Sequence, residues 1–183
     1  MNPLLHAEQA WQTLGKPRAG VVIIDGRSGS GKTSLAASLA PLMGAERLHM
    51  DDLYEGWQGL LAAPATLVRA LETGRYRRYD WHLGAFAETR ELDRDAPLII
   101  EGCGSLTRET LDAAAVFGGQ VLSIWLECPL DVRKSRAIAR DGNAFEPYWE
   151  DWASQEAEHI RRETPERLAG HHFSTAHTAE VAS

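Results

Sequence analysis

A glycine-rich segment near the start of the chain has the residue types and spacing of a phosphate-binding loop. Gly26 is followed, after four residues, by Gly31, Lys32 and Thr33, which completes the pattern G-x-x-x-x-G-K-[ST]. Glycines let the backbone turn tightly, so that successive N–H groups can point inward at an anion. Lys32 can reach the β- and γ-phosphates, and the Thr33 hydroxyl can ligate Mg²⁺. The segment therefore predicts a site for a nucleoside triphosphate with Mg²⁺, held by Gly26, Ser28, Gly29, Ser30, Gly31, Lys32, Thr33 and Ser34.

The elements around this loop are those that the motif requires. Residues 21–24 read VVII, an apolar run typical of a strand buried on both faces, and residues 34–42 continue a helix that begins near Lys32. The positive end of that helix dipole adds to the attraction for phosphate. A chance Gly/Ser loop ending in Lys-Thr is the alternative, but strand, loop and helix stand in register.

Carboxylates follow two other predicted strands. Asp51 and Asp52 come at the end of a strand at 47–50, and Glu101 follows the strand at 98–100. In an open parallel sheet these ends lie along the edge where ligands bind. We assign Asp51 as the catalytic base that deprotonates an acceptor hydroxyl, and Glu101 with Thr33 as the Mg²⁺ ligands. Asp52 is either a helix cap or a residue that supports the site without touching the reacting groups. A transition-metal site of His49 with both aspartates, or a structural Glu101, stays open.

A helix predicted at 130–140 carries a row of arginines. Arg133, Arg136 and Arg140 recur at i, i+3 and i+7, which places them on one face, and Asp141-Gly142-Asn143 permits a hinge after them. We expect a lid at about 136–147 that brings arginines onto the transferring phosphoryl group, with Arg140 catalytic and Arg133 facing the substrate. A solvated arginine face is the alternative.

Aromatic side chains gather around the predicted acceptor side. Tyr54, Trp57, Tyr79 and Trp81 either wall an acceptor pocket or pack in the core. The neighbouring arginines at 75, 77 and 78 either bind an acidic acceptor or are solvated. Cys103 and Cys128 are expected to be reduced packing residues, without a nucleophilic role.

Length, composition and net charge limit the class of protein and the kinds of partner. The chain has 183 residues, 44% hydrophobic and 25% charged, with a formal net charge of −7. This profile predicts a single domain over 1–183, a small-molecule partner, no nucleic-acid partner, no membrane partner and a cytoplasmic location. Whether the protein forms a homo-oligomer is left open.

The order of the predicted elements indicates an α/β fold. Strands alternate with helices, which predicts a central parallel sheet. Residues 53–73 are expected to be mostly helical with a break at Pro64, residues 74–83 a loop, residues 88–95 a helical turn, and residues 171–175 a last edge strand.

Five segments together resemble the uridine kinase and phosphoribulokinase branch of the nucleoside and nucleotide kinase-like P-loop proteins. They are GRSGSGKT at 26–33, MDDLY at 50–54, YDW at 79–81, IIEG at 99–102 and RKSRAIARDG at 133–142. The resemblance covers roughly residues 20–145 and implies a three-layer P-loop kinase fold. It also implies that Asp51 is the base on the acceptor side and that Tyr79 and Asp80 contact the acceptor, to which we add Tyr54. In the related adenylate kinases, one helix carries a proline and two arginines at the spacing of Pro129, Arg136 and Arg140. There the first arginine stacks on adenine and the second points toward phosphate.

The expected function is therefore that of a small-molecule kinase. The γ-phosphoryl group of MgATP would pass to a hydroxyl of a nucleoside or nucleoside-like acceptor, with pantothenate, a sugar or an antibiotic left open. The alternative is an NTP-binding regulatory or assembly protein with weak ATPase activity. A switch GTPase is disfavoured, because no [NT]-K-x-D guanine motif occurs in the chain.

Overall fold

The computed structural model describes residues 3–18, 20–141 and 145–175 of the chain. Within them, five strands form one sheet in the order β2-β5-β1-β6-β7, and every neighbouring pair is parallel. The strands are β1 (Val21–Asp25), β2 (Glu46–His49), β5 (Leu98–Glu101), β6 (Val121–Glu127) and β7 (His171–Ser174). The predicted parallel sheet is confirmed, including an edge strand at 171–174.

Helices cover both faces of this sheet. Along β1, Val22 and Ile24 pack into one hydrophobic core, which α1 (Pro3–Thr13) and α2 (Lys32–Met43) complete. Val21 and Ile23 pack into the other core, with α3 (Ala63–Thr73) and α4 (Arg108–Gly118). Each fully buried isoleucine of β1 contributes roughly 1.5–3 kcal/mol of burial free energy. The predicted three-layer α/β architecture is confirmed.

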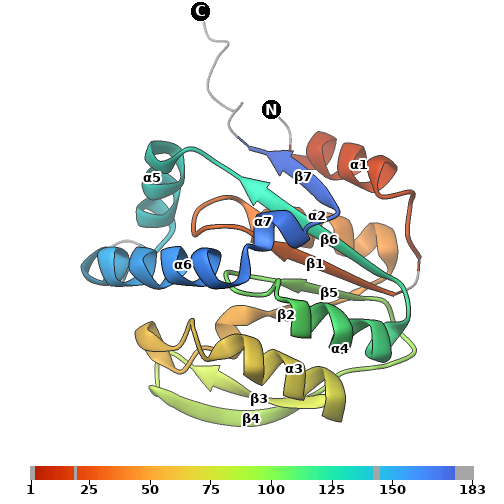
Figure 1. The fold of residues 1–183 in the computed structure, drawn as a ribbon, viewed down its shortest axis with the longest axis horizontal. Coiled ribbons are helices and arrows are strands. Elements are labelled where there is room, and N and C mark those ends of the chain that lie inside the picture. Colours follow the sequence, from red (N-terminus) through yellow and green to blue (C-terminus); the bar gives the residue numbers. More distant parts are fainter. Residues whose placement is uncertain (1–2, 19, 142–144, 176–183) are drawn as a thin grey trace, which may run out of the picture.

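The strand register brings the candidate site residues to one edge. His49, the last residue of β2, pairs with Glu101, the last residue of β5, and Glu101 pairs in turn with Ile24 of β1. The phosphate loop leaves β1 one residue later, after Asp25. Figure 1 shows the arrowheads of β1 and β6 directed toward the side of the molecule where α5 (Leu130–Asp141) and α6 (Trp149–Glu163) lie.

A β-hairpin replaces the loop and the helical turn expected between residues 74 and 95. Strands β3 (Arg75–Asp80) and β4 (Ala85–Glu91) pair antiparallel, apart from the main sheet. The prediction was wrong because the register shifts between Arg77 and Tyr79, so that the buried Tyr76 and Tyr79 do not alternate at a period of two. Strand β4 is mostly exposed and polar, and it offers no apolar alternation to detect.

Two other segments differ from expectation. The helix expected over 53–73 is α3 alone, preceded by the short 3₁₀ turns η1 (Met50–Asp52) and η2 (Gly56–Gln58). Pro64 lies in the first turn of α3 and does not break it, because the early positions of a helix need no backbone N–H donor. Pro41 lies inside the last turn of α2, which ends at Met43 with Gly44 as its C-cap.

The region after α5 contains η4 (Glu146–Tyr148), α6 and α7 (Pro165–Leu168). The predicted lid at 136–147 includes residues 142–144, which lie outside the described residues.

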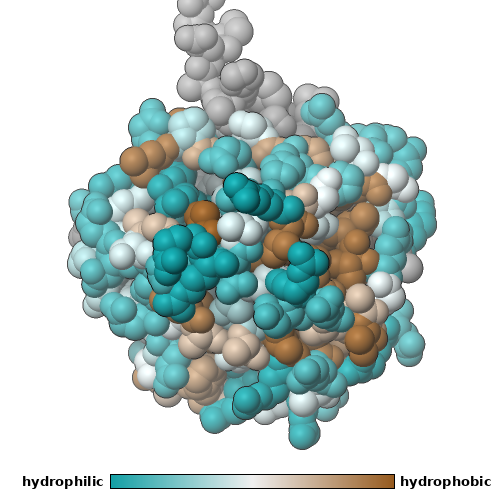
Figure 2. Space-filling view, in the orientation of Figure 1, coloured by the Kyte–Doolittle hydropathy of each residue, from teal (hydrophilic) through white to brown (hydrophobic). Residues whose placement is uncertain are grey.

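Figure 2 shows hydrophilic residues over most of the viewed face, with hydrophobic ones gathered toward the right of the view. Among the described helices, none combines the length and apolar character needed to cross a membrane.

Candidate active site

The phosphate loop has the backbone conformation that its glycines predict. Gly26, Gly29 and Gly31 have φ angles of 151°, 78° and 97°, which side-chain-bearing residues rarely adopt. A Cβ atom on Gly29 would lie 2.0 Å from the carbonyl oxygen of Arg133, because the loop passes directly against α5. The loop then enters α2 at Lys32, so the expected strand, loop and helix are all present.

Lys32 is buried in the loop. Its Nζ donates to the Arg27 carbonyl oxygen at 3.0 Å and lies 3.5 Å from the Cys103 sulfur. Burial lowers the pKa of Lys32, but nearby negative charges, among them the carboxylates of Glu101 and Glu156, outweigh that effect, and the pKa is raised. The ammonium group therefore stays charged, as a partner for phosphate oxygens must be.

Thr33 and Glu101 meet as predicted. The Thr33 hydroxyl donates to Glu101 Oε1 at 3.0 Å, and His49 Nδ1 lies 2.6 Å from the same oxygen. Burial acts to raise the pKa of Glu101, but the hydrogen bond with His49 and the charge of Lys32 prevail and lower it. An ionised carboxylate beside a hydroxyl provides the hard oxygen ligands that Mg²⁺ prefers, so these residues fit that ion.

His49 makes its hydrogen bond with Glu101, not with the two aspartates that follow it. This hydrogen bond raises the pKa of His49. Within the described residues, no three His, Cys, Asp or Glu side chains are arranged to hold a metal ion. The structure therefore does not build the transition-metal site of His49 with both aspartates.

Asp51 lies in η1, exposed to solvent and close to the other charges of the site. Surrounding protein atoms and the negative charge of Glu101 raise the pKa of its carboxyl group, while Arg140 and Lys32 oppose the shift. The Asp51 carbonyl oxygen accepts a hydrogen bond from Trp81 Nε1 at 2.9 Å, which ties this turn to the hairpin.

Asp52 caps none of the described helices, so of the two roles expected for it the helix cap is not found. Its Oδ2 accepts a hydrogen bond from the Tyr76 hydroxyl at 3.2 Å, so it joins η1 to β3. Desolvation and the negative charge of Asp52 raise the pKa of Tyr76 to about 12, which keeps the phenol protonated as the donor. The two adjacent aspartates therefore face different surroundings.

The structure gives the predicted acceptor residues other partners. Tyr54 is fully buried, and its hydroxyl donates to the Cys103 carbonyl oxygen at 2.7 Å. Tyr79 is buried against Trp81. Asp80 accepts from the backbone N–H groups of the turn after β3, at 2.9 and 3.1 Å. Tyr54 and Tyr79 thus serve as packing residues and Asp80 as a turn residue, and their contact with an acceptor stays a prediction.

The aromatic cluster packs mostly on itself. The Trp57 ring is stacked on Tyr148 with centroids 4.7 Å apart, and it lies 4.8 Å from Trp81. Trp57 and Trp81 remain partly exposed. Solvent or a ligand can reach this pair as well as the exposed Tyr148, and Trp81 is hydrogen-bonded to the Asp51 backbone.

Three arginines of α5 have different surroundings. Arg133 is buried, with Nη1 3.6 Å from Glu156 Oε2 and its guanidinium carbon 5.3 Å from the centroid of the Trp149 ring. Arg136 donates to the Thr175 hydroxyl and carbonyl oxygens, both at 3.2 Å. The positive charge of Arg140 acts to lower the pKa of the Asp51 carboxyl group. The three arginines were predicted to share one face of the helix, but each interacts with a different part of the site.

Thr175 is a site residue that the sequence did not reveal. Its hydroxyl donates to the carbonyl oxygen of Ser30 at 2.8 Å, so Arg136 is linked through it to the phosphate loop. It directly follows the edge strand β7, in a segment whose sequence carries no motif.

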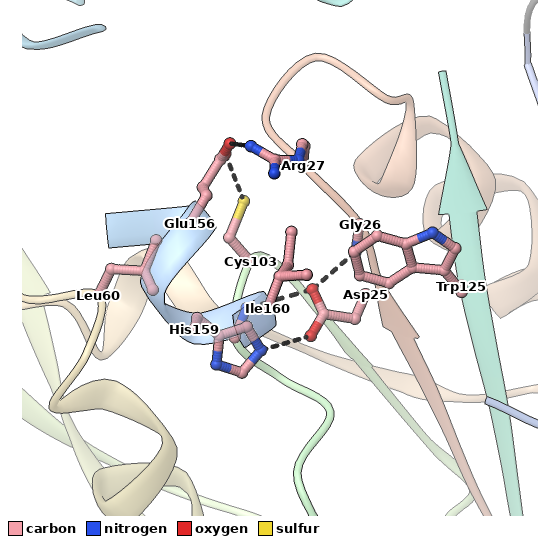
Figure 3. Close-up of a pocket in the computed structure, with 10 residues that line it drawn as sticks. Asp25, Gly26, Arg27, Leu60, Cys103, Trp125, Glu156, His159 and Ile160 are labelled. Carbon is pink, nitrogen blue, oxygen red and sulfur yellow. Dashed lines mark hydrogen bonds and ion pairs between the residues drawn. The ribbon is translucent and has the colours of Figure 1, made fainter. Parts of the chain in front are cut away.

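Sequence reasoning also missed the contribution of α6. Figure 3 shows Glu156 and His159 of this helix directed toward the loop after β1. Glu156 Oε1 accepts from the Ser28 backbone N–H at 2.7 Å, and His159 Nε2 lies 3.4 Å from Asp25 Oδ2. Asp25 also accepts from the Gly26 and Leu106 N–H groups, at 2.6 and 2.9 Å. In the sequence, the signal for a role of Asp25 was that it directly precedes Gly26, the first residue of the phosphate-loop motif.

Cys103 is buried among these polar groups and does not simply fill space. Its sulfur lies 3.4 Å from Glu156 Oε1 and 3.5 Å from the Ser28 hydroxyl. Burial raises the pKa of the thiol to about 12, so it remains protonated and is no nucleophile. The expected absence of a nucleophilic role is consistent with this chemistry.

The fold and this edge of the sheet define a P-loop kinase architecture. A possible uridine kinase from Bacillus stearothermophilus has a TM-score of 0.60 and 22% identity, over 94% of this chain and 100% of that one. Shikimate kinase from Acinetobacter baumannii has a TM-score of 0.52 and 16% identity, over 96% and 88%. The predicted resemblance to P-loop kinases of the nucleoside and nucleotide kinase-like class is confirmed at the level of the fold.

Sequence comparison points to the same class. A cytidylate kinase from Methanococcoides burtonii is 26% identical over 145 residues, which cover 78% of this chain and 75% of that protein. The chain spans 61% of the length of two further cytidylate kinases that it matches. No protein-family model matches the chain.

Proposed function

We propose that this protein is an ATP-dependent kinase that transfers the γ-phosphoryl group of MgATP to a hydroxyl group of a small molecule. The observation that carries the proposal is the meeting of Lys32, the Thr33–Glu101 pair and Asp51 at one edge of the sheet. Phosphoryl transfer depends mainly on positioning and on the neutralisation of charge, and these groups supply both. The kinase relatives support the same reaction class.

Each residue has a defined task in this reaction. The loop N–H groups and Lys32 hold the phosphates, and the Thr33 hydroxyl and Glu101 would hold Mg²⁺, which neutralises charge on the phosphate oxygens when bound. Asp51 accepts the proton of the attacking hydroxyl, and the raised pKa of its carboxyl group suits a base near neutral pH. Arg140, whose charge acts on Asp51, balances charge on the transferred group.

A hydroxyl acceptor is favoured over a phosphate acceptor, although cytidylate kinase acts on a nucleotide. A hydroxyl needs a base such as Asp51, whereas a phosphate acceptor needs cationic partners. On the acceptor side, Arg78 is paired with Asp80 and Glu88, and Arg77 donates to backbone carbonyl groups of β4. These described arginines are thus engaged within the hairpin.

A planar ring on the acceptor is supported by the aromatic surface next to Asp51. Trp57 and Trp81 are partly exposed and lie 4.8 Å apart, and Trp81 is hydrogen-bonded to the Asp51 backbone. Stacking on such rings favours a nucleoside or a similar flat molecule. Roles for Tyr79 and Asp80 in contacting that acceptor remain part of the proposal.

A phosphotransfer screen tests the function. Wild-type protein is incubated with MgATP labelled on the γ-phosphate and with nucleosides, sugars, vitamins or cytidine monophosphate. We expect label on the hydroxyl of a nucleoside-like acceptor, and transfer slower by about a hundredfold or more in the Asp51→Asn variant. Label on cytidine monophosphate alone would identify a phosphate acceptor. ATP hydrolysis that no acceptor stimulates would favour a regulatory ATPase.

A further inference from the structure

Glu156 occupies the place of an anion in the phosphate loop. Its side chain is 2% exposed, and its Oε1 accepts the Ser28 backbone N–H at 2.7 Å. Backbone N–H groups of such a loop bind phosphate oxygens, so a carboxylate oxygen here is a chemical stand-in for one. The helix that carries Glu156 lies outside every motif of the sequence.

Two arginines face the same carboxylate. Glu156 Oε2 lies 3.7 Å from Arg27 Nη1 and 3.6 Å from Arg133 Nη1. The Arg27 side chain is 31% exposed and that of Arg133 is 7% exposed. Three elements thus bring one negative and two positive groups together at the loop, with an excess of positive charge.

The geometry of this group is incomplete. Within the described part of the chain, Glu156 Oε2 and Arg133 Nη1 are buried and have no hydrogen-bond partner, although they lie close to one another. Buried charged atoms are normally hydrogen-bonded, and exceptions call for an explanation. A planar carboxylate offers two oxygens, whereas a phosphoryl group offers three in a tetrahedral array, which suits the Ser28 N–H and two guanidinium groups better.

We propose that Arg27 and Arg133 bind a phosphoryl group of the nucleotide, and that Glu156 holds their place until the nucleotide arrives. This inference rests on the proposed ATP site. The carboxylate neutralises the two arginines before the nucleotide binds and is exchanged for a phosphoryl oxygen on binding. Glu156 is thus a positioning residue, and Arg27 and Arg133 are further ligands of the phosphate.

The exchange has a measurable cost in affinity. A negative charge at the Ser28 N–H repels the incoming triphosphate and must leave its two cationic partners. Replacing Glu156 with glutamine keeps the shape but removes the charge, so the two arginines become available to the ligand. A residue that merely supports the fold would show no gain in affinity when its charge is removed.

The test measures binding of MgATP, and of inorganic phosphate, by calorimetry without any acceptor. We expect Glu156→Gln to bind MgATP about tenfold more tightly than wild type, since each factor of ten in Kd is about 1.4 kcal/mol. The control is Glu150→Gln, on the same helix but exposed, which should bind as wild type does. Equal or weaker binding by folded Glu156→Gln overturns the inference.

A second variant decides the question if Glu156→Gln does not fold. Arg27 is partly exposed, so Arg27→Ala should fold, and we expect it to bind MgATP about tenfold more weakly, because a charge-assisted contact is lost. Unchanged affinity in Arg27→Ala overturns the inference while leaving the kinase proposal intact. Wild-type protein that binds no MgATP overturns the kinase proposal itself, and the inference with it.

Discussion

The β3–β4 hairpin and the phosphate-loop edge are both rich in charge, but they use it differently. In the hairpin, Arg78 lies 2.6 Å from Glu88 and 2.9 Å from Asp80, so the charges are paired within one local unit. At the phosphate loop, Glu156 and Arg133 are buried, come from separate helices, and keep atoms without hydrogen bonds in the described structure.

This difference separates a structural network from a binding site. Partly exposed ion pairs add little to stability and need no ligand. Buried charges with incomplete hydrogen bonding destabilise the fold, and such arrangements are expected mainly where function requires them. A cluster of arginines in a sequence is therefore a weak signal of ligand binding until the partners of each one are known.

The largest expected effect is on the base. Asp51→Asn should lower kcat by about 10²–10⁴-fold, the usual contribution of a positioned general base, and should leave MgATP affinity nearly unchanged. The matched variant Asp52→Asn loses only part of a hydrogen bond with Tyr76, so stability should fall by about 1 kcal/mol and kcat should change little. Both variants are compared by steady-state kinetics and thermal unfolding. If the pattern is reversed, the roles of Asp51 and Asp52 are exchanged.

A smaller effect is expected from the buried lysine of the loop. Lys32→Ala should weaken MgATP binding by an order of magnitude or more, on the order of 2 kcal/mol, because charge-assisted contacts are lost. Lys134→Ala is the control, since this partly exposed lysine pairs with the exposed Glu150 and not with the phosphate loop. Equal affinities of the two variants in a calorimetric titration would contradict the assignment of the loop as the phosphate site.

A further variant tests how Arg136 contributes. Arg136→Ala removes the link through Thr175 to Ser30 and should weaken MgATP binding by about 1 kcal/mol. If the arginine stacks on adenine, inorganic triphosphate should bind the variant as it binds wild type. If the arginine only positions the loop, both ligands should bind more weakly, and Thr175→Val should reproduce that loss.

The smallest expected effect lies in the hairpin. Hydrogen bonds from Arg78 lower the pKa of Glu88 to about 2. A lowered carboxyl pKa stabilises the fold at pH values above the unfolded pKa of about 4.3, and this contribution is lost as the pH falls toward 2. An NMR titration of Glu88 should therefore show a midpoint far below 4, which Arg78→Ala should raise. A midpoint near 4 in wild type would mean that the hairpin network does not form.

The sequence predicted the parts of the molecule that depend on local pattern. The apolar run before Gly26, the glycines of the loop and the meeting of Thr33 with Glu101 all followed from residue type and strand position. The hairpin was missed because a register shift breaks the alternation of Tyr76 and Tyr79. Glu156 was missed because the residues around it in the sequence do not differ from those around a solvent-exposed glutamate of a helix, and its contact with the phosphate loop comes only from the tertiary fold.

The Ser28–Glu156 hydrogen bond also bears on how the chain folds. Its two residues are 128 positions apart, and Asp25 and Leu106 are 81 apart. Contacts between distant segments form late and slow the folding of parallel sheets. During synthesis, the motif at 26–33 emerges long before α6, so every residue of the loop exists while its buried counter-charge does not. In the proposed exchange, the loop therefore acquires both the carboxylate that competes with phosphate and its ligand Arg133 only when the last third of the chain has docked.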